Sequence, residues 1–193
     1  MQSIARLVRN VSVAAIGAIL AVSAHAQSFT IDGAHSSAEF RIRHLGVSNV
    51  SGRFNDIAGT ITIDEKDETK NAVEVTIKAE SIDTANEARD KHLRNADFFD
   101  VEKFPTLSFK SKTCKKTGEG KYEITGDFTT HGVTKEIKVE AEKIGDGKGR
   151  NGEALIGFET EFKINRTDYG MNTSTTLIGD EVKITVAVEA GAK

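Results

Sequence analysis

The sequence has no tryptophan, one proline and one cysteine among its 193 residues. With Cys114 alone, no internal disulfide can form. No Pro-rich or Gly/Ser-rich stretch divides the chain, and this favours a single domain rather than two joined by a linker. Stability must therefore come from apolar burial in one core.

An excess of basic residues is also lacking. The 26 Lys and Arg against 29 Asp and Glu give a formal net charge of −3, and removing Arg6 and Arg9 with the N-terminal segment makes it −5. A nucleic-acid-binding domain normally shows a basic footprint. We therefore expect no nucleic-acid partner.

The longest apolar run is too short to cross a membrane. It comprises fourteen residues, 11–24, whereas a spanning helix needs about 20. Two arginines precede the run, and Ala24-His25-Ala26 follows the A-x-A pattern of a cleavage site. The pattern predicts a signal peptide at 1–26, cleavage after Ala26 and an exported domain at 27–193 without stable membrane insertion.

Apolar and polar residues alternate along most of residues 27–193, which is the period-2 signature of half-buried strands. In AEFRIR, for example, Ala38, Phe40 and Ile42 share one face. Seven further segments alternate in the same way. The eight predicted strands lie at 38–43, 57–63, 73–79, 107–109, 122–128, 137–141, 154–164 and 182–188.

The connections between these strands are short and polar, as at 64–71, 115–120 and 145–152. Parallel strands would need crossovers of a dozen or more residues, so the pattern favours an antiparallel meander. Helix-forming composition occurs only at 86–95. An eight-stranded sheet removes its edges by closing, and we predict an all-β antiparallel barrel with one short helix near its mouth.

An eight-stranded barrel is either filled by its own side chains or holds one small ligand. Periodicity alone does not separate these alternatives. The predicted inward residues are mostly small, and their large members are few: Phe40, Phe109, Tyr122, Phe128, Phe158 and Phe162. Modest wall residues favour a cavity.

The segment 92–109 holds four of the ten phenylalanines, and Phe98, Phe99 and Phe104 lie outside any predicted strand. Loops normally carry polar residues at such positions. These rings are expected to hold the helix onto the barrel mouth and to line the entrance to a hydrophobic cavity. A purely packing role is the alternative.

Charged residues accompany this aromatic segment. Arg89, Asp90 and His92 lie in the predicted helix, and Arg166 and Asp168 follow the long strand that ends at 164. Arginine binds phosphate or carbonyl oxygens with a forked set of donors. The five residues are therefore candidates for contact with a polar head group, and surface ion pairing is the alternative.

Four stretches resemble the YceI-like family. DGAHSSAEFRIRHLGVSNVSGRFNDIAGTI (32–61) resembles the family's D-x-x-H-S-x-x-x-F-x-I-x-H-x-G-V-S-x-V-x-G-x-F opening. The other matches, in order, are RDKHLRNADFFDVEKFP (89–105), TTHGVTKEI (129–137) and NRTDYGMN (165–172). Together they extend over essentially all of residues 27–193.

The resemblance implies a lipocalin-like barrel in the periplasm, commonly dimeric, that binds a long isoprenoid or similar amphiphile. It also implies wall or mouth positions for Phe40, Ile42, Phe98, Phe99, Phe104, Phe109, Phe128 and Phe162. Phe158 joins them from the alternation. Arg89, Asp90, His92, Arg166 and Asp168 stand at the family's polar motif positions.

Two other functions compete with lipid binding. A histidine-based enzyme is one, but no G-x-S-x-G or H-E-x-x-H signature occurs. An interaction module with a filled core, in which the aromatic segment contacts a partner, is the other. Histidines near turns are expected to be structural, so we expect no metal and no cofactor.

Overall fold

The computed structural model describes residues 26–192, and most of them lie in one antiparallel sheet. The strands, in chain order, are β1 (Gln27–Ile31), β2 (Ser37–His44), β3 (Ser48–Phe54), β4 (Ile57–Ile63), β5 (Ala72–Lys78), β6 (Ile82–Asp83), β7 (Thr106–Gly118), β8 (Lys121–Thr130), β9 (Val133–Lys148), β10 (Ala154–Asn165) and β11 (Ile178–Ala192). The helix α1 (Glu87–Arg94) and three 3-10 turns, η1 (Glu68–Lys70), η2 (Ala79–Ser81) and η3 (Arg166–Tyr169), connect them. The predicted signal peptide lies outside the described residues except for Ala26.

The eleven strands form eight barrel strands, because three are interrupted. β1 and β2 are two pieces of one barrel strand, because both pair with β11. β3 and β4 are two pieces of the next strand, since β3 pairs with β2 and β4 pairs with β1. β5 and β6 are two pieces of a third strand, since β5 pairs with β4 and β6 pairs with β3. The eight predicted strands correspond to these eight, whereas the shorter pieces β1, β3 and β6 were missed.

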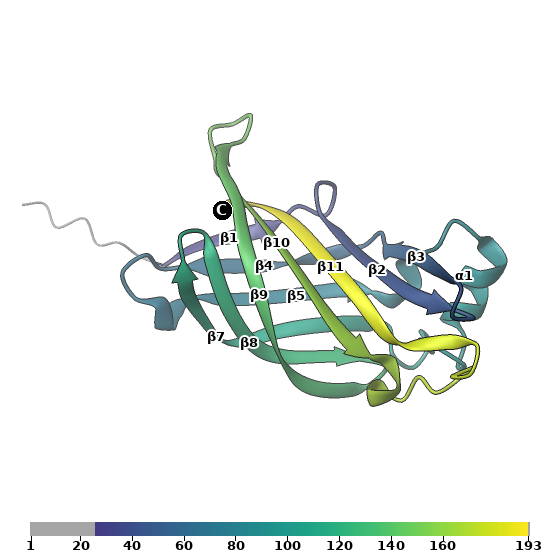
Figure 1. Ribbon diagram of the computed structural model, residues 1–193. Helices are drawn as coiled ribbons and strands as arrows, with labels where there is room; N and C mark the ends of the chain where they lie inside the picture. The colour runs from purple at the N-terminus through teal and green to yellow at the C-terminus, as the bar shows by residue number, and fades with distance from the viewer. Residues whose placement is uncertain (1–25, 193) are drawn as a thin grey trace, which may run out of the picture.

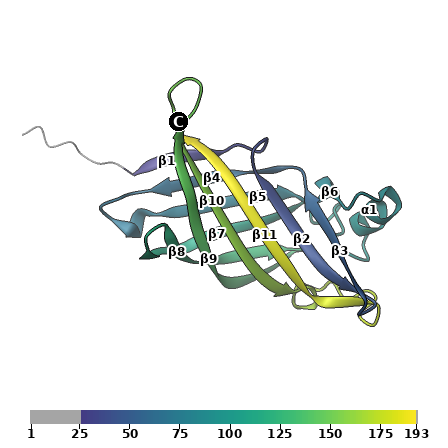
Figure 2. The same cartoon turned by 45° about the horizontal axis from the view of Figure 1, so that its top comes forward.

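Pairing of β1 with β11 closes the ring β1-β4-β5-β7-β8-β9-β10-β11. Figures 1 and 2 show the resulting barrel, whose strands run obliquely around it. The prediction of an eight-stranded antiparallel barrel is confirmed. Closure gives the long strands hydrogen-bonding partners on both sides.

The helix α1 lies at one end of the barrel, which we call the α1 end (Figure 1). It matches the helix predicted at 86–95, and the Asn86 side chain caps it by accepting a hydrogen bond from the Arg89 backbone N–H. The β2–β3 turn and the loop 171–177 lie at the same end (Figure 2). The α1 end therefore brings the aromatic segment and the segment after β10 together.

The packed core is divided along the barrel. One cluster at the α1 end includes Phe54, Ile82 and Tyr169, and a second at the opposite end includes Phe29 and Ile156. The remaining cluster joins β7, β8 and β9. Helices within residues 26–192 are all too short or too polar to span a bilayer.

Candidate functional site

A cavity of about 270 Å³ lies inside the barrel. Its wall consists of inward-facing side chains from the barrel strands together with residues of α1 and the segment that follows it. Small-molecule sites usually occupy roughly 300–1,000 Å³, so the space is near the lower end of that range. The interior is not filled by its own side chains, which contradicts the filled-core alternative.

The cavity is long for its volume. Val182 and Val188 both line it, from positions six residues apart on β11, and six residues span about 20 Å of strand. A space of this volume that extends over such a length must be narrow. Its shape suits a linear guest.

Most of the predicted apolar residues line this cavity. They are Phe40, Ile42, Phe98, Phe99, Phe109, Phe128, Phe158 and Phe162. The first two come from β2, and the next two from the segment after α1, where the Phe99 ring packs edge-on to Phe54 with centroids 5.5 Å apart. Residues from distant parts of the sequence therefore share one apolar surface.

Phe104 differs from this prediction and lies outside the cavity lining. Its ring packs against His131 with centroids 4.8 Å apart, beside the backbone of Gly132. The backbone N–H of Phe104 donates to the carbonyl of Asp100 over 2.8 Å, which closes a turn after α1. That turn directs the ring onto the β8–β9 connection instead of the barrel interior.

Arg89 and Asp90 connect α1 to Thr84, in the segment that precedes the helix. Arg89 Nε donates to the Thr84 hydroxyl over 2.7 Å and Nη2 to the Thr84 carbonyl over 2.8 Å. The buried Asp90 carboxylate accepts from the Thr84 backbone N–H over 2.9 Å and from its hydroxyl. Arg89 and Thr84 line the cavity, whereas Asp90 lies behind them. Asp90 is therefore a structural residue.

Arg166 is buried, with 3% of its surface exposed, and it borders the cavity. Its guanidinium donates to three carbonyls, those of Gly179 (2.9 Å), Met171 (2.5 Å) and Ile178 (3.1 Å). Burial lowers the pKa of Arg166, and the charge of Asp180 opposes that shift. Within residues 26–192 no carboxylate forms an ion pair with it. Arg166 thus fastens the loop between η3 and β11.

His92 and Asp168, also predicted for the head group, are on the surface. His92 Nε2 lies 2.9 Å from Asp97 Oδ2, and both side chains are more than half exposed. Asp168 pairs with Lys135 over 3.2 Å. Neither residue lines the cavity. Surface ion pairing, the alternative reading, describes these two positions.

Thr130 is a polar residue of the cavity that the sequence prediction missed. It is 1% exposed, lines the cavity at the α1 end of β8, and its hydroxyl has no hydrogen-bond partner within the described residues. The alternation of Tyr122, Ile124, Gly126 and Phe128, continued by one step, would have placed it inward. Buried polar groups are usually bonded, so this hydroxyl is available to a guest.

Cys114 also lines the cavity, on β7. The thiol is buried, and burial raises its pKa. Because a raised pKa disfavours the reactive thiolate, the side chain is an apolar part of the wall.

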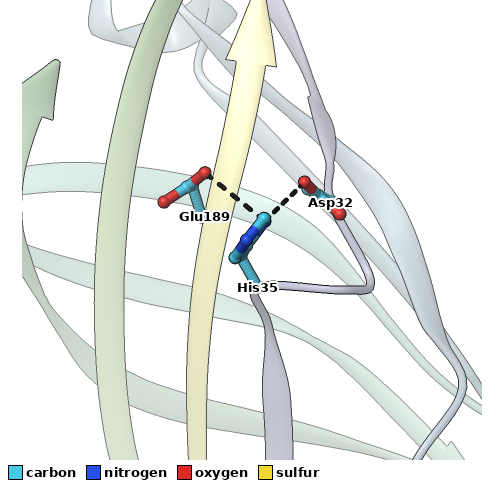
Figure 3. Close-up of side chains that lie close together, drawn as sticks. All are labelled: Asp32, His35 and Glu189. Carbon is cyan, nitrogen blue, oxygen red and sulfur yellow. Dashed lines mark hydrogen bonds and ion pairs between the residues drawn. The ribbon is translucent and has the colours of Figure 1, made fainter. Parts of the chain in front are cut away.

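A separate cluster occupies the interruption between β1 and β2 (Figure 3). His35 Nδ1 lies 2.8 Å from Asp32 Oδ2 and 3.9 Å from Glu189 Oε1. The bond to Asp32 raises the pKa of His35. Ser36 replaces a backbone partner of β11 between β1 and β2, because its hydroxyl accepts a hydrogen bond from the Glu189 backbone N–H over 3.1 Å.

These three side chains also form the one group with three metal-type ligands among residues 26–192. His35 Nδ1 bonds to Asp32. The cluster is satisfied as an ion pair and does not touch the cavity. It spans the strand interruption, from the β1–β2 connection to β11.

Comparison with known proteins places the fold and the family. The chain is 43% identical to protein YceI of Escherichia coli O157:H7 over 169 residues, covering 86% of this chain and 88% of that protein. The structure of the Campylobacter jejuni YceI protein matches with a TM-score of 0.70 and 38% identity over 78% of this chain and 90% of that chain.

A polyisoprenoid binding domain from Saccharophagus degradans has the same fold, with a TM-score of 0.68 at 13% identity, covering 86% of this chain and 99% of that chain. The model of the YceI-like domain matches residues 29–190, from within β1 to within β11. The chain therefore belongs to the YceI-like family.

Proposed function

We propose that the protein binds a long-chain isoprenoid, such as a polyprenyl or isoprenoid-quinone lipid, or a similar amphiphile inside the barrel. The narrow apolar cavity is the observation that carries this proposal. It extends along at least six residues of β11, and its lining is mostly apolar, with Thr84, Arg89, Thr130 and Arg166 at the α1 end and Thr62, Asn71 and Tyr122 toward the opposite end. The fold relative from Saccharophagus degradans, described as a polyisoprenoid binding domain, supports the same class of guest.

The energetics give the tail and the head group of the lipid different roles in binding. Transfer of a tail from water would release about 0.8 kcal/mol per CH₂, but a tail that comes from a membrane has already gained this. Transfer into the barrel is then nearly neutral in hydrophobic terms. Preference for one lipid must come from the fit of the tail and from polar contacts with its head.

We place the head group at the α1 end. The Thr130 hydroxyl is free to bond, and the three carbonyl bonds of Arg166 leave two of its five guanidinium N–H groups for other acceptors. Arg89 also borders the cavity there. These groups would donate hydrogen bonds to a phosphate or carbonyl oxygen.

We propose binding rather than catalysis. The four histidines of the described chain lie apart: His35 is at the β1–β2 interruption, His44 ends β2, His92 is in α1 and His131 follows β8. Only His44 lines the cavity. A histidine-based mechanism would need these groups closer together.

Solvent extraction of the purified protein followed by mass spectrometry tests the proposal. The wild type should release a long-chain amphiphile. Phe99→Asp, which puts a charge in the cavity, should release little, whereas the matched variant Phe104→Asp, outside the lining, should keep its lipid if its melting temperature shows that it is folded. Equal lipid content in Phe99→Asp and the wild type would contradict the cavity as the binding site.

We also propose that the protein is exported to the periplasm, loses residues 1–26 and forms a homodimer. The charge and cleavage pattern of residues 1–26 supports export, and the family resemblance supports the dimer. Intact-mass analysis of a periplasmic extract should find a chain that starts at Gln27. Light scattering on the same sample should give twice the mass of one chain.

A further inference from the structure

We infer that the α1 end docks onto an anionic lipid surface through exposed apolar side chains beside the cavity. We call Leu45, Val47 and Leu177 the tip patch; they are 53%, 81% and 51% exposed. The inference extends the proposed function, because a lipid guest has to be collected from a membrane.

The three residues belong to two loops that touch. The Leu45 backbone N–H donates to the Leu177 carbonyl over 2.7 Å, and the β2–β3 turn meets the start of β11 at one corner of the barrel (Figure 2). His44 and Ile178, the neighbours of Leu45 and Leu177, both line the cavity. The tip patch is therefore continuous with the cavity wall.

The turn that presents Leu45 is an unfavourable place for leucine. Leu45 and Gly46 have φ angles of +51° and +71°, and the Val47 backbone N–H donates to the His44 carbonyl over 3.1 Å. Four-residue β-turns with both central residues at positive φ are dominated by Gly, Asn and Asp, with a preference for Asn-Gly or Asp-Gly. An exposed leucine there serves neither the turn nor the core, and such outliers often mark functional positions.

The charge around the tip patch fits an anionic surface. Residues 40–52 contain Arg41 and Arg43 and no Asp or Glu, and residues 169–179 contain no charged residue, although the chain as a whole is acidic. Within the described chain neither arginine forms an ion pair. The Arg43 side chain starts beside Gly179, where an added Cβ would lie 3.1 Å from its Cβ. Basic side chains therefore flank the apolar tip.

Flotation with vesicles tests the inference. We expect wild-type protein to float with vesicles of equal parts phosphatidylcholine and phosphatidylglycerol and to bind pure phosphatidylcholine more weakly. Arg41→Gln and Arg43→Gln should each lower the partition coefficient about fivefold at low salt. The triple variant Leu45→Asn, Val47→Asn, Leu177→Asn should lower it by more than about tenfold.

Two controls separate docking from folding. Leu45→Asn alone creates the preferred Asn-Gly turn, so its melting temperature should hold or rise while its vesicle binding falls. Ile144→Asn removes an apolar side chain of β9 that is 66% exposed and lies outside the tip patch; its binding should equal that of the wild type.

Failure of the wild type to float with anionic vesicles, or flotation of the triple variant like the wild type, would overturn the inference. Conversion of a wild-type dimer into a monomer by the triple variant, without vesicle binding by either, would assign the patch to a second copy of the chain and also overturn it. Lipid extracted from the same samples tests the proposed function separately, since a loaded barrel that does not bind vesicles refutes docking alone.

Discussion

The inward faces of β8 and of the β10–β11 pair have similar apolar composition but very different packing. On β8, Ile124, Phe128 and Thr130 are buried. On β10 and β11, Phe162 and Ile184 also point inward, yet both are only half-buried and line the cavity. All five side chains line the cavity. Those of β8 are almost fully covered by their neighbours, whereas Phe162 and Ile184 leave more of their surface facing the hollow.

Truncation of a phenylalanine on each wall should show this difference most strongly. Phe128→Ala removes a ring from the packed wall and should cost about 3–5 kcal/mol of unfolding free energy. Phe162→Ala should cost roughly half as much, because this ring is only half-buried whereas Phe128 is buried. Urea denaturation of delipidated protein measures both. Equal costs would show that the two walls are packed alike.

Enlargement of one residue on each wall should again cost more stability on β8 than on β11. Ile124→Phe enlarges a side chain that is already buried among its neighbours, and it should cost about 1–3 kcal/mol. Ile184→Phe extends into the hollow, so it should cost less than about 1 kcal/mol while reducing the lipid recovered by solvent extraction. An outward change on the same strand, Thr185→Phe, is the control and should keep the lipid. Full lipid content in Ile184→Phe would place the guest elsewhere.

Two threonines near the α1 end allow a comparison between a hydroxyl with hydrogen-bond partners, that of Thr84, and one without a partner among the described residues, that of Thr130. Thr84→Val removes a hydroxyl bonded to Arg89 and Asp90 and should cost about 1–2 kcal/mol. Thr130→Val removes a buried hydroxyl without a partner among the described residues, so the empty protein should keep or gain stability, by up to about 1 kcal/mol. Lipids extracted from Thr130→Val should differ in head group from those of the wild type. Destabilisation of empty Thr130→Val as large as that of Thr84→Val would show that its hydroxyl is bonded.

The smallest effect is expected on the outer surface, at a cluster that does not line the cavity. The Asp32 carboxylate raises the pKa of His35 by hydrogen bonding, so Asp32→Asn should lower that pKa, as read by NMR titration of the imidazole. Since the folded pKa is raised, any stabilisation by this pair is present below the ordinary histidine pKa and is lost as pH rises through the folded value. An unchanged pKa in Asp32→Asn would remove this account of the cluster. Lipid content should not change.

Strand periodicity was enough to predict the barrel, because inward and outward residues alternate over long segments such as β10 and β11. It missed β3, whose inward Gly52 leaves no apolar side chain at that position; an added Cβ would lie 2.5 Å from the Phe40 ring. It also missed the short strands β1 and β6, since segments of five and two residues are too short to show a clear alternation of apolar and polar residues.

The apolar lining was predictable for the same reason, whereas the polar residues were not. Arg166 bonds to three carbonyls in the segment between the predicted strands 154–164 and 182–188, and no periodicity reports such a contact. Asp168 and His92 were predicted from their positions in sequence motifs, and a motif position does not show whether a side chain faces the cavity or the solvent. Phe104 left the predicted lining because a local turn reverses the chain after α1.

A crystal structure of the protein as purified, without delipidation, tests the central claim most directly. The account predicts one continuous tube of electron density along β10 and β11, passing Phe162 and Ile184 and ending near Thr130. Side chains that meet across the barrel, or separate ordered waters in place of the tube, would contradict it.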